Sequence, residues 1–310
     1  MTWPEWPTWD ALSHRAWTYF IDGHLLGHSG RITLAISLVI LAEAMVRDWP
    51  KTTMYRLFVR RSGSAKVDLF YYLLQMCGLG LVLEILFTSG LALACSRAAD
   101  ALSTKLAWAR ITLPEHNLPW FVVSFLIYWI VSNFYSYWIH RFYHRPILWH
   151  AHRFHHSAEE LNFLTRFRLH PLESLSRVFY VVSPLVILDA SPKVLLAVTI
   201  VGDTVNFLQH SELPWKWGWI GRWLFSSPVV HQIHHSIDER HRDTNFSLCP
   251  LWDHVFGTWY PGDDTAVAYG MKDSGYERPV RQMLIDSRAL YLHLASWLSS
   301  PLRRRIAERA

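Results

Sequence analysis

The sequence predicts an all-α, multi-pass membrane protein with about four transmembrane or hairpin helices and a cytoplasmic, histidine-rich helical cap. Three observations carry this prediction. Hydrophobic residues make up 51% of the 310 residues and aromatic residues 15%, with 17 tryptophans, a composition typical of membrane helices with aromatic residues at both interfaces. Long apolar runs alternate with short clusters of Lys and Arg. Finally, 13 of the 18 histidines lie between His140 and His254.

Four apolar regions follow a Trp-rich N-terminal segment. Residues 1–30 predict a short helix at the membrane surface and no cleavable signal peptide. The apolar regions are residues 32–46, 67–94, 119–139 and 178–205. The first is shorter than the roughly 20 residues that a span requires. The fourth is interrupted before Pro192, and because proline breaks the interior of a helix, it predicts two shorter helices that form a hairpin.

The loop charges predict one orientation. Lys and Arg gather in residues 47–66 and 141–177, whereas few occur before Arg31 or in residues 96–118. Because positive loops face the cytoplasm, the N-terminus is expected outside and every histidine pattern inside. The net charge is +5, but no nucleic-acid-binding motif accompanies it, so we expect no nucleic-acid partner. The three cysteines form no CxxC pair, which argues against a zinc ribbon or a disulfide framework.

Eight histidines form one HxxxH and two HxxHH patterns: His140 and His144; His152, His155 and His156; His231, His234 and His235. Residues three and four apart share a face of a helix, so we expect each pattern to aim its imidazoles at one point. Clustered imidazoles without a metal would repel one another when protonated and leave donors unpaired when buried. The patterns therefore predict a metal site.

The number of imidazoles predicts two metal ions. A catalytic zinc takes about three protein ligands, so eight to ten histidines would supply two ions with four or five nitrogens each. Imidazole suits iron, copper, zinc and nickel alike, and the spacing leaves the metal open. The isolated histidines are expected to be structural: His116, His150, His254 and His293.

Further motifs surround the histidine patterns in a fixed order. They are W-x-H-R-x-x-H from Trp138, L-W-x-x-H-x-x-H-H-S from Leu148, N-x-x-T-x-x-R-x-H-P from Asn162, H-S at His210, P-x-x-H-x-x-H-H from Pro228, D-x-N-F from Asp243 and W-D-x-x-F-G-T from Trp252. Order and spacing together resemble the membrane-bound fatty acid hydroxylase and sterol desaturase superfamily, which uses a histidine-ligated di-iron centre. The resemblance covers residues 135–260.

The resemblance implies a division of the chain into an interfacial segment at 1–30, membrane helices and loops at 31–118, a catalytic domain at 119–262 and a C-terminal helical tail at 263–310. It implies nine metal ligands: His140, His144, His152, His155, His156, His210, His231, His234 and His235. Asn206 stands one turn before His210, where parts of the family carry a histidine, and is expected to hold a water or support a ligand.

Four other residues are candidates for orienting the ligands: His170, Asp243, Asn245 and Asp253. For the last three, helix capping and turn formation are the alternative. His241 stands between Arg240 and Arg242, which favours a solvated turn.

The implied reaction is the O2-dependent hydroxylation or desaturation of an unactivated C–H bond of a lipid at two iron ions, with zinc as a substitute in isolated protein. No flavin, haem, nicotinamide or iron–sulfur motif is visible, so electrons are expected from a ferredoxin, a cytochrome b5-like protein or a reductase. The expected location is the bacterial inner membrane, otherwise the endoplasmic reticulum.

The substrate stays open between a fatty acyl chain, a sterol or other terpenoid, and an ether lipid. A carotenoid hydroxylase is an alternative within the enzyme class. A membrane metal transporter or metal-binding protein is an alternative from another class. Transporters hold their ligands near the bilayer midplane, whereas these histidines lie beyond the ends of apolar runs. A zinc hydrolase would require a general base of the HExxH type, which is not seen.

Overall fold

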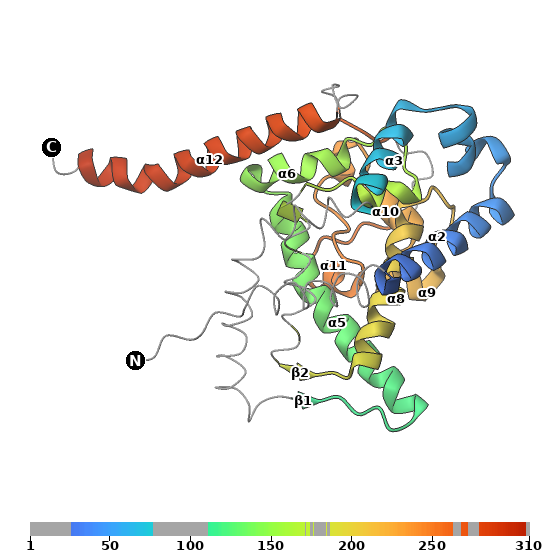
Figure 1. Cartoon of the computed structure of the whole chain (residues 1–310). Coiled ribbons are helices and arrows are strands. Elements are labelled where there is room, and N and C mark those ends of the chain that lie inside the picture. Colours follow the sequence, from blue (N-terminus) through green and yellow to red (C-terminus); the bar gives the residue numbers. More distant parts are fainter. Residues whose placement is uncertain are drawn as a thin grey trace, which may run out of the picture.

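The computed structural model describes residues 26–76, 111–170, 187–262, 268–271 and 279–307, together with 172, 173, 176 and 184. Most of these residues are helical (Figure 1). The predicted N-terminal surface helix, residues 77–94 of the second apolar region and most of the first half of the predicted hairpin lie outside the described residues.

The helices in chain order are α2 (Leu26–Val46), α3 (Gly63–Met76), α5 (Leu118–Tyr143), α6 (Pro146–His156), α8 (Pro192–His210), α9 (Gly218–Trp223), α10 (Pro228–His234), α11 (Leu251–Val255) and α12 (Pro279–Ala307). Shorter helical turns are η2 (Trp49–Lys51), η3 (Tyr55–Val59), η5 (Phe163–Phe167) and η7 (Glu239–His241). The mostly helical fold agrees with the all-α prediction.

Helix α5 is the long apolar helix of the described residues. Asn117 caps its first turn by accepting a hydrogen bond from the backbone N–H of Trp120 at 3.1 Å. The helix ends at Tyr143, three residues before Pro146, because the residue before a proline disfavours the helical conformation. Its 26 residues correspond to about 39 Å at 1.5 Å per residue, more than the roughly 30 Å of a bilayer core. Within the described part of the chain, α5 is the one helix long and apolar enough to cross a membrane.

Helix α8 lies beside α5 and runs in the same direction. Ser191 caps its start at the backbone N–H of Val194, and Pro192 occupies the first turn, where its missing N–H costs nothing. The helix break predicted before Pro192 is therefore confirmed. A parallel pair of two-residue strands, β1 (Ile111–Thr112) and β2 (Leu188–Asp189), joins the segments that lead into α5 and α8 (Figure 1). Because these strands are parallel, the two helices start at one end of the molecule and finish at the other.

Helix α2 packs against α8, and α3 packs against η5, which also contacts α8. The buried face of α2 contributes Ile32, Ala35 and Val39 to a core that contains Phe154 and Phe207. The remaining faces of α2 are also apolar but exposed: Leu34 and Leu41 are each 57% exposed and Met45 is 77% exposed. An apolar helix with one buried face and several exposed ones is typical of a helix in contact with lipid.

A buried ion pair joins α3 to the segment after α6. Asp68 accepts a hydrogen bond from the Nε of Arg168 at 2.6 Å, and the two side chains are 0% and 1% exposed. The same carboxylate accepts hydrogen bonds from the amide of Asn162 at 2.6 Å and the hydroxyl of Thr165 at 2.9 Å. The motif N-x-x-T-x-x-R therefore converges on a single partner nearly 100 residues earlier, which sequence analysis did not identify.

We expect replacement of Asp68 by Ala to destabilise the protein strongly. Removing one partner of a buried ion pair leaves the other charge uncompensated, which typically costs about 3–5 kcal/mol. The measurement is the midpoint of denaturant unfolding in detergent. Asp48→Ala is the control, because its ion pair with Lys51 is exposed and its loss should leave the midpoint nearly unchanged. Equal effects of the two substitutions would contradict the prediction.

Candidate metal centre

Nine histidines from separate helix ends meet at the end of the molecule where α5 and α8 finish. They are His140 and His144 at the end of α5, His152, His155 and His156 on α6, His210 at the end of α8, and His231, His234 and His235 on or directly after α10. All nine histidines predicted as ligands are thus brought together.

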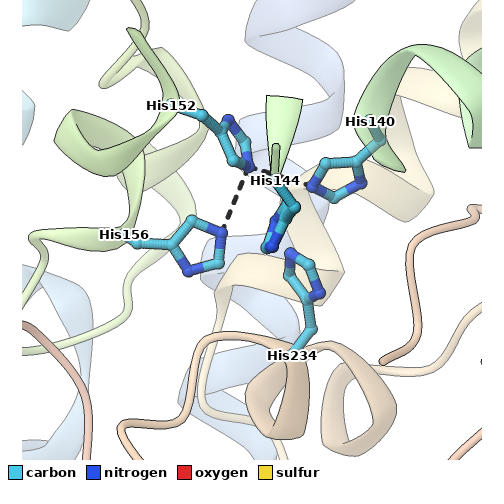
Figure 2. Close-up of side chains that lie close together, drawn as sticks. All are labelled: His140, His144, His152, His156 and His234. Atoms are coloured by element: carbon cyan, nitrogen blue, oxygen red, sulfur yellow. Dashed lines mark hydrogen bonds between the residues drawn. The ribbon is translucent and has the colours of Figure 1, made fainter. Parts of the chain in front are cut away.

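Five of them form cluster A: His140, His144, His152, His156 and His234. Their rings surround a common space (Figure 2). One ring nitrogen of each lies within 4.8 Å of the others. The Nε2 of His152 lies 3.0 Å from that of His140 and 3.1 Å from that of His156.

The other four form cluster B: His155, His210, His231 and His235. The Nε2 of His210 lies 3.1 Å from that of His155 and 3.2 Å from that of His231. The two clusters adjoin, because the ring centroids of His156 in cluster A and His235 in cluster B are 4.4 Å apart.

Each HxxHH pattern serves both clusters, which corrects the expectation that each pattern aims at one point. His152 and His156 belong to cluster A and His155 to cluster B; His231 and His235 belong to cluster B and His234 to cluster A. At 3.6 residues per turn, residue i+4 lies about 40° to one side of residue i and residue i+3 about 60° to the other side. The two histidines of an i,i+4 pair therefore point to the same cluster, while the third histidine of the pattern points to the other cluster.

Hydrogen bonds at Nδ1 determine which nitrogen of each ring carries the proton. The Nδ1 of His140 lies 2.6 Å from the carbonyl oxygen of Phe246, and the Nδ1 of His234 lies 2.7 Å from the carbonyl oxygen of Thr244. A carbonyl can only accept, so Nδ1 carries the proton, and a neutral imidazole has only one. The Nε2 atoms of these rings are therefore bare acceptors that point into the cluster.

Bare acceptors that face one another at about 3 Å require a cation between them. His155 and His210 place their Nδ1 atoms against the carbonyl oxygens of Arg168 and Asn206, at 3.3 and 2.7 Å, and still face each other through Nε2. Two nitrogens that are each about 2.1 Å from one metal ion lie about 3 Å apart when the bonds are perpendicular. The Nε2 atoms of His144 and His234 are buried without a hydrogen-bond partner. The donor set thus fits two metal ions.

Among the residues proposed to orient the ligands, Asp243 touches a ring directly. Its Oδ1 lies 3.3 Å from the Nδ1 of His144. Asp253 acts one step further away by accepting hydrogen bonds from the backbone N–H groups of Phe246 and Ser247, at 2.7 and 2.9 Å. This holds the Phe246 carbonyl that receives the proton of His140.

Asn245 and His170 lie outside the ring contacts. The amide of Asn245 donates to the carbonyls of Val230 and Tyr260 and accepts from the N–H of Tyr260, so it fixes the loop after α10. The Nε2 of His170 lies 2.7 Å from the hydroxyl of Ser287 on α12, and its backbone N–H donates to Glu173. The expected solvated turn at His241 is wrong: this side chain is only 2% exposed and its ring packs on Tyr260.

Glu173, which no sequence pattern indicated, places its Oε1 2.5 Å from the Nδ1 of His152 in cluster A. The carboxylate is 6% exposed. Such carboxylates orient a metal-bound histidine and increase its basicity. The sequence offered one signal for this role: Glu173 is an acidic residue three positions after His170, close to the end of the N-x-x-T-x-x-R-x-H-P motif.

A cavity of about 230 Å³ extends from both clusters between α5 and α8. Histidines of both clusters line one end of it: His140, His152, His155, His210 and His231. The other end is lined by Tyr128, Trp129, Leu195 and Val198. The side chain of Asn206 also lines the cavity, and its carbonyl oxygen lacks a hydrogen-bond partner among the described residues.

Burial keeps the clustered imidazoles neutral. Loss of hydration, followed by the neighbouring imidazoles, lowers the pKa of His144, His155, His156, His231 and His235 well below 6.5. Burial lowers the pKa of His234 to about 3. Metal ligation requires the neutral form of imidazole, so the site is ready to bind metal at neutral pH.

The comparison with protein families agrees with this geometry. Residues 125–258 match the model of the family described as fatty acid hydroxylase. This region contains all nine clustered histidines and the residues that line the cavity. The resemblance seen in the sequence motifs is therefore confirmed over this part of the chain. No solved structure matches the chain.

Curated relatives share the same region. An alkylglycerol monooxygenase of Danio rerio is 34% identical over 136 residues, covering 43% of this chain and 29% of the relative. An ornithine lipid hydroxylase of Rhizobium tropici is 29% identical over 123 residues, covering 39% of this chain and 37% of the relative. The human alkylglycerol monooxygenase is 30% identical over 135 residues, covering 43% of this chain and 29% of the relative. The chain thus spans about a third of the length of these relatives.

We expect the metal-free protein to lose stability as the pH falls below 6.5. The folded-state pKa of the clustered histidines lies below the ordinary value of 6.5, and that of His234 is about 3. Between these values the unfolded chain binds more protons than the folded one, so stability rises with pH. Unfolding midpoints of chelator-treated protein should therefore fall between pH 7 and pH 5. A midpoint that stays constant over this range would contradict the burial of neutral imidazoles.

We expect Glu173→Gln to weaken metal binding at cluster A. Loss of a partner that orients a ligand typically reduces metal affinity about 10- to 100-fold. Competition with a chelator should therefore remove one ion per chain from the variant at a lower chelator concentration than from the wild type. Glu159→Gln is the matched control, since Glu159 is exposed just after α6. Identical chelator curves for the wild type and Glu173→Gln would refute the role of Glu173.

Proposed function

We propose that this chain is a membrane-bound, non-haem di-iron monooxygenase that hydroxylates, or desaturates, an unactivated C–H bond of a lipid with O2 and electrons from a separate donor. The observation that carries the proposal is the pair of adjacent all-histidine clusters, with five and four ligand nitrogens, at the end of one cavity. The family match and the lipid-oxidising names of the relatives support it.

Iron is the metal that best suits this donor set and this reaction. A hydrolytic zinc site needs a Lewis acid and an activated water, and about three protein ligands are enough for it. Two bound ferrous ions would supply the electrons that reduce O2, one ion held by cluster A and the other by cluster B. Zinc is expected to replace iron in some isolated preparations, since imidazole binds both.

The protein residues hold the ligands and keep them neutral. The carbonyls of Phe246 and Thr244 and the carboxylate of Glu173 accept the Nδ1 protons of three cluster A rings. Every Nε2 is thereby directed to the metal position. The cavity admits the substrate from the side of α5 and α8, while the buried rings exclude bulk water.

The exposed apolar residues support a location in the membrane. Besides those of α2, they include Val122 and Val123 on α5, 44% and 40% exposed, and Leu196 on α8, 49% exposed. We propose a multi-pass topology with the clusters on the cytoplasmic side, as the loop charges predict. A ferredoxin, a cytochrome b5-like protein or a reductase would then approach from the cytoplasm. The bacterial inner membrane is the favoured location, otherwise the endoplasmic reticulum.

The names of the relatives favour a lipid with a polar headgroup over a carotenoid or a sterol. Alkylglycerols and ornithine lipids each join a long chain to a polar group. A metal transporter is disfavoured, because transported ions bind where broken helices meet near the bilayer midplane. Here, at least five ligand rings are fixed through Nδ1 to backbone carbonyls or a carboxylate, which suits permanent retention.

We expect two iron ions per chain in protein prepared with its native metal, and His155→Ala to abolish lipid oxidation. Loss of His155 removes one of four nitrogens from cluster B. Elemental analysis and mass spectrometry of the lipids, for a gain of one oxygen or a loss of two hydrogens, are the measurements. His254→Ala is the control, because this ring stacks on Trp223 outside both clusters. One ion or none with intact histidines, or a fully active His155→Ala variant, would overturn the proposal.

A further inference from the structure

Helices α2 and α3 and the turn η3 between them form an N-terminal unit that precedes the family match, which begins at residue 125. The turn is π-helical, because the backbone N–H of Arg60 donates to the carbonyl of Tyr55 at 2.9 Å. Such turns are rare and are often found at functional sites. This one directs Arg56 into the protein, where it is 8% exposed, whereas the nearby Phe58 is 65% exposed. A cation is thus buried while an apolar side chain is left outside.

The guanidinium of Arg56 contacts two segments that are far apart in the sequence. Its Nη1 donates to the backbone carbonyl of Leu161 at 3.1 Å, and its Nη2 donates to the Oε2 of Glu212 at 2.6 Å. Both nitrogens belong to one rigid, planar group, so they fix the separation of their two partners. Arg56 therefore clamps the segment after α6 to the segment after α8.

Both of these segments leave helices that contribute to cluster B. Glu212 follows His210, the last residue of α8, by two positions, and Leu161 follows His155 by six. The Nε2 atoms of His155 and His210 lie 3.1 Å apart. Two residues of backbone span at most about 7 Å, so a displacement of Glu212 is transmitted to the end of α8. The separation of the two rings therefore depends on the clamp.

Neighbouring charges hold the clamp in place. Arg47, directly after α2, donates to the same Oε2 of Glu212 at 3.1 Å. Glu160 lies 3.5 Å from the Nε of Arg56 and 3.3 Å from the Nη1 of Arg60. A buried ion pair adds little net stability compared with apolar packing of the same volume. The network is therefore better explained by the position that it imposes than by the stability that it adds.

We propose that Arg56 is a positioning residue for cluster B. It holds the carbonyl of Leu161 and the carboxylate of Glu212 at one separation, and so sets the distance between the ends of α6 and α8 on which two rings of the cluster depend. The N-terminal unit, which lies outside the family match, thereby completes the metal site. The inference rests on the proposed function in that cluster B must hold a metal ion, but it is independent of the substrate and of the electron donor.

The test measures metal binding and needs no turnover. Purified, metal-free, full-length protein in detergent is titrated with Co²⁺, which imidazole binds, and the ions bound per chain are counted. We expect the wild type to bind two ions and Arg56→Met to bind one of them at least about tenfold more weakly, as is typical when a residue that orients a ligand is lost. Arg56→Lys should be similarly impaired, because an ammonium is a point charge that cannot hold both partners at a fixed separation.

Arg60→Met is the matched control. Arg60 directly follows η3 and pairs with Glu160, but its side chain is 59% exposed, and this ion pair reaches only one of the two segments. Thr53→Val separates a loss of stability from a loss of position. Thr53 is 2% exposed and donates its hydroxyl proton to Glu43 within the N-terminal unit. This variant should lower the unfolding midpoint and leave the affinity for both Co²⁺ ions unchanged.

Combination with His155→Ala assigns the effect to a cluster. Loss of His155 impairs cluster B, so the ion that remains is held by cluster A. Adding Arg56→Met should then leave the affinity for this ion unchanged, and a further loss would overturn the inference. Glu212→Gln keeps the volume of its side chain and weakens the same contact. It should also weaken one ion, and it decides the matter if Arg56→Met fails to fold.

Three other results would overturn the inference: wild-type Co²⁺ affinity in Arg56→Met, full recovery in Arg56→Lys, or an equal loss of affinity in Thr53→Val. These results are distinguishable from a failure of the proposed function, because the wild type would still bind two ions. A wild type that binds one ion or none would instead remove the di-iron proposal, and with it the site on which Arg56 acts.

Discussion

Nine imidazoles packed into two adjoining clusters, with unprotonated nitrogens facing one another in each, are the constraint on which the rest of this structure depends. Without metal, the Nε2 lone pairs of His140 and His152 repel at 3.0 Å and those of His155 and His210 at 3.1 Å. The fold must therefore hold these rings by their other nitrogens, and it holds six of the nine in this way. It does so with backbone carbonyls for His140, His155, His210 and His234 and with carboxylates for His144 and His152.

These supports are themselves fixed by residues further from the metal positions. Asp253 holds the loop that presents the Phe246 carbonyl. Burial raises the pKa of Asp253 to about 7, whereas the hydrogen bonds from Ser247, Thr258 and Phe246 favour its charged form. Arg168 presents its carbonyl to His155 while its guanidinium is held by Asp68 and Ser157. The buried ion pair between α3 and the post-α6 segment thus reaches the metal centre through one peptide group.

Which histidines come together could be predicted from sequence, but the cluster that each of them joins could not. The i,i+3 and i,i+4 spacings select histidines on one side of a helix, and the surrounding motifs add His210, which has no pattern of its own. Within an HxxHH pattern, the helical spacing alone separates the i,i+4 pair from the third histidine. Which cluster the pair joins depends on where the other helices lie, and local spacing does not contain that.

Supporting residues were harder to predict for the same reason. Asp68 lies 100 residues from Arg168, in a helix that reads as the start of an apolar region, so nothing local indicates its partner. Glu173 follows a recognised motif but forms no pattern with it. The break before Pro192, by contrast, was predictable, because proline acts on its own turn of the chain.

The two clusters differ in charge and in ligand number, and this difference follows from the elements that build them. Cluster A has five imidazoles and the carboxylates of Glu173 and Asp243 at two of its Nδ1 atoms. Cluster B has four imidazoles, and the partners of His155 and His210 are neutral carbonyls. Negative charge near the ligands stabilises the more oxidised form of a metal ion, so cluster A is the more electron-rich position. Cluster B has one histidine fewer, and its His210 lies on α8 one turn from Asn206, whose unpartnered side-chain oxygen lines the cavity. The cavity therefore reaches cluster B beside a neutral amide and cluster A beside the carboxylate of Glu173.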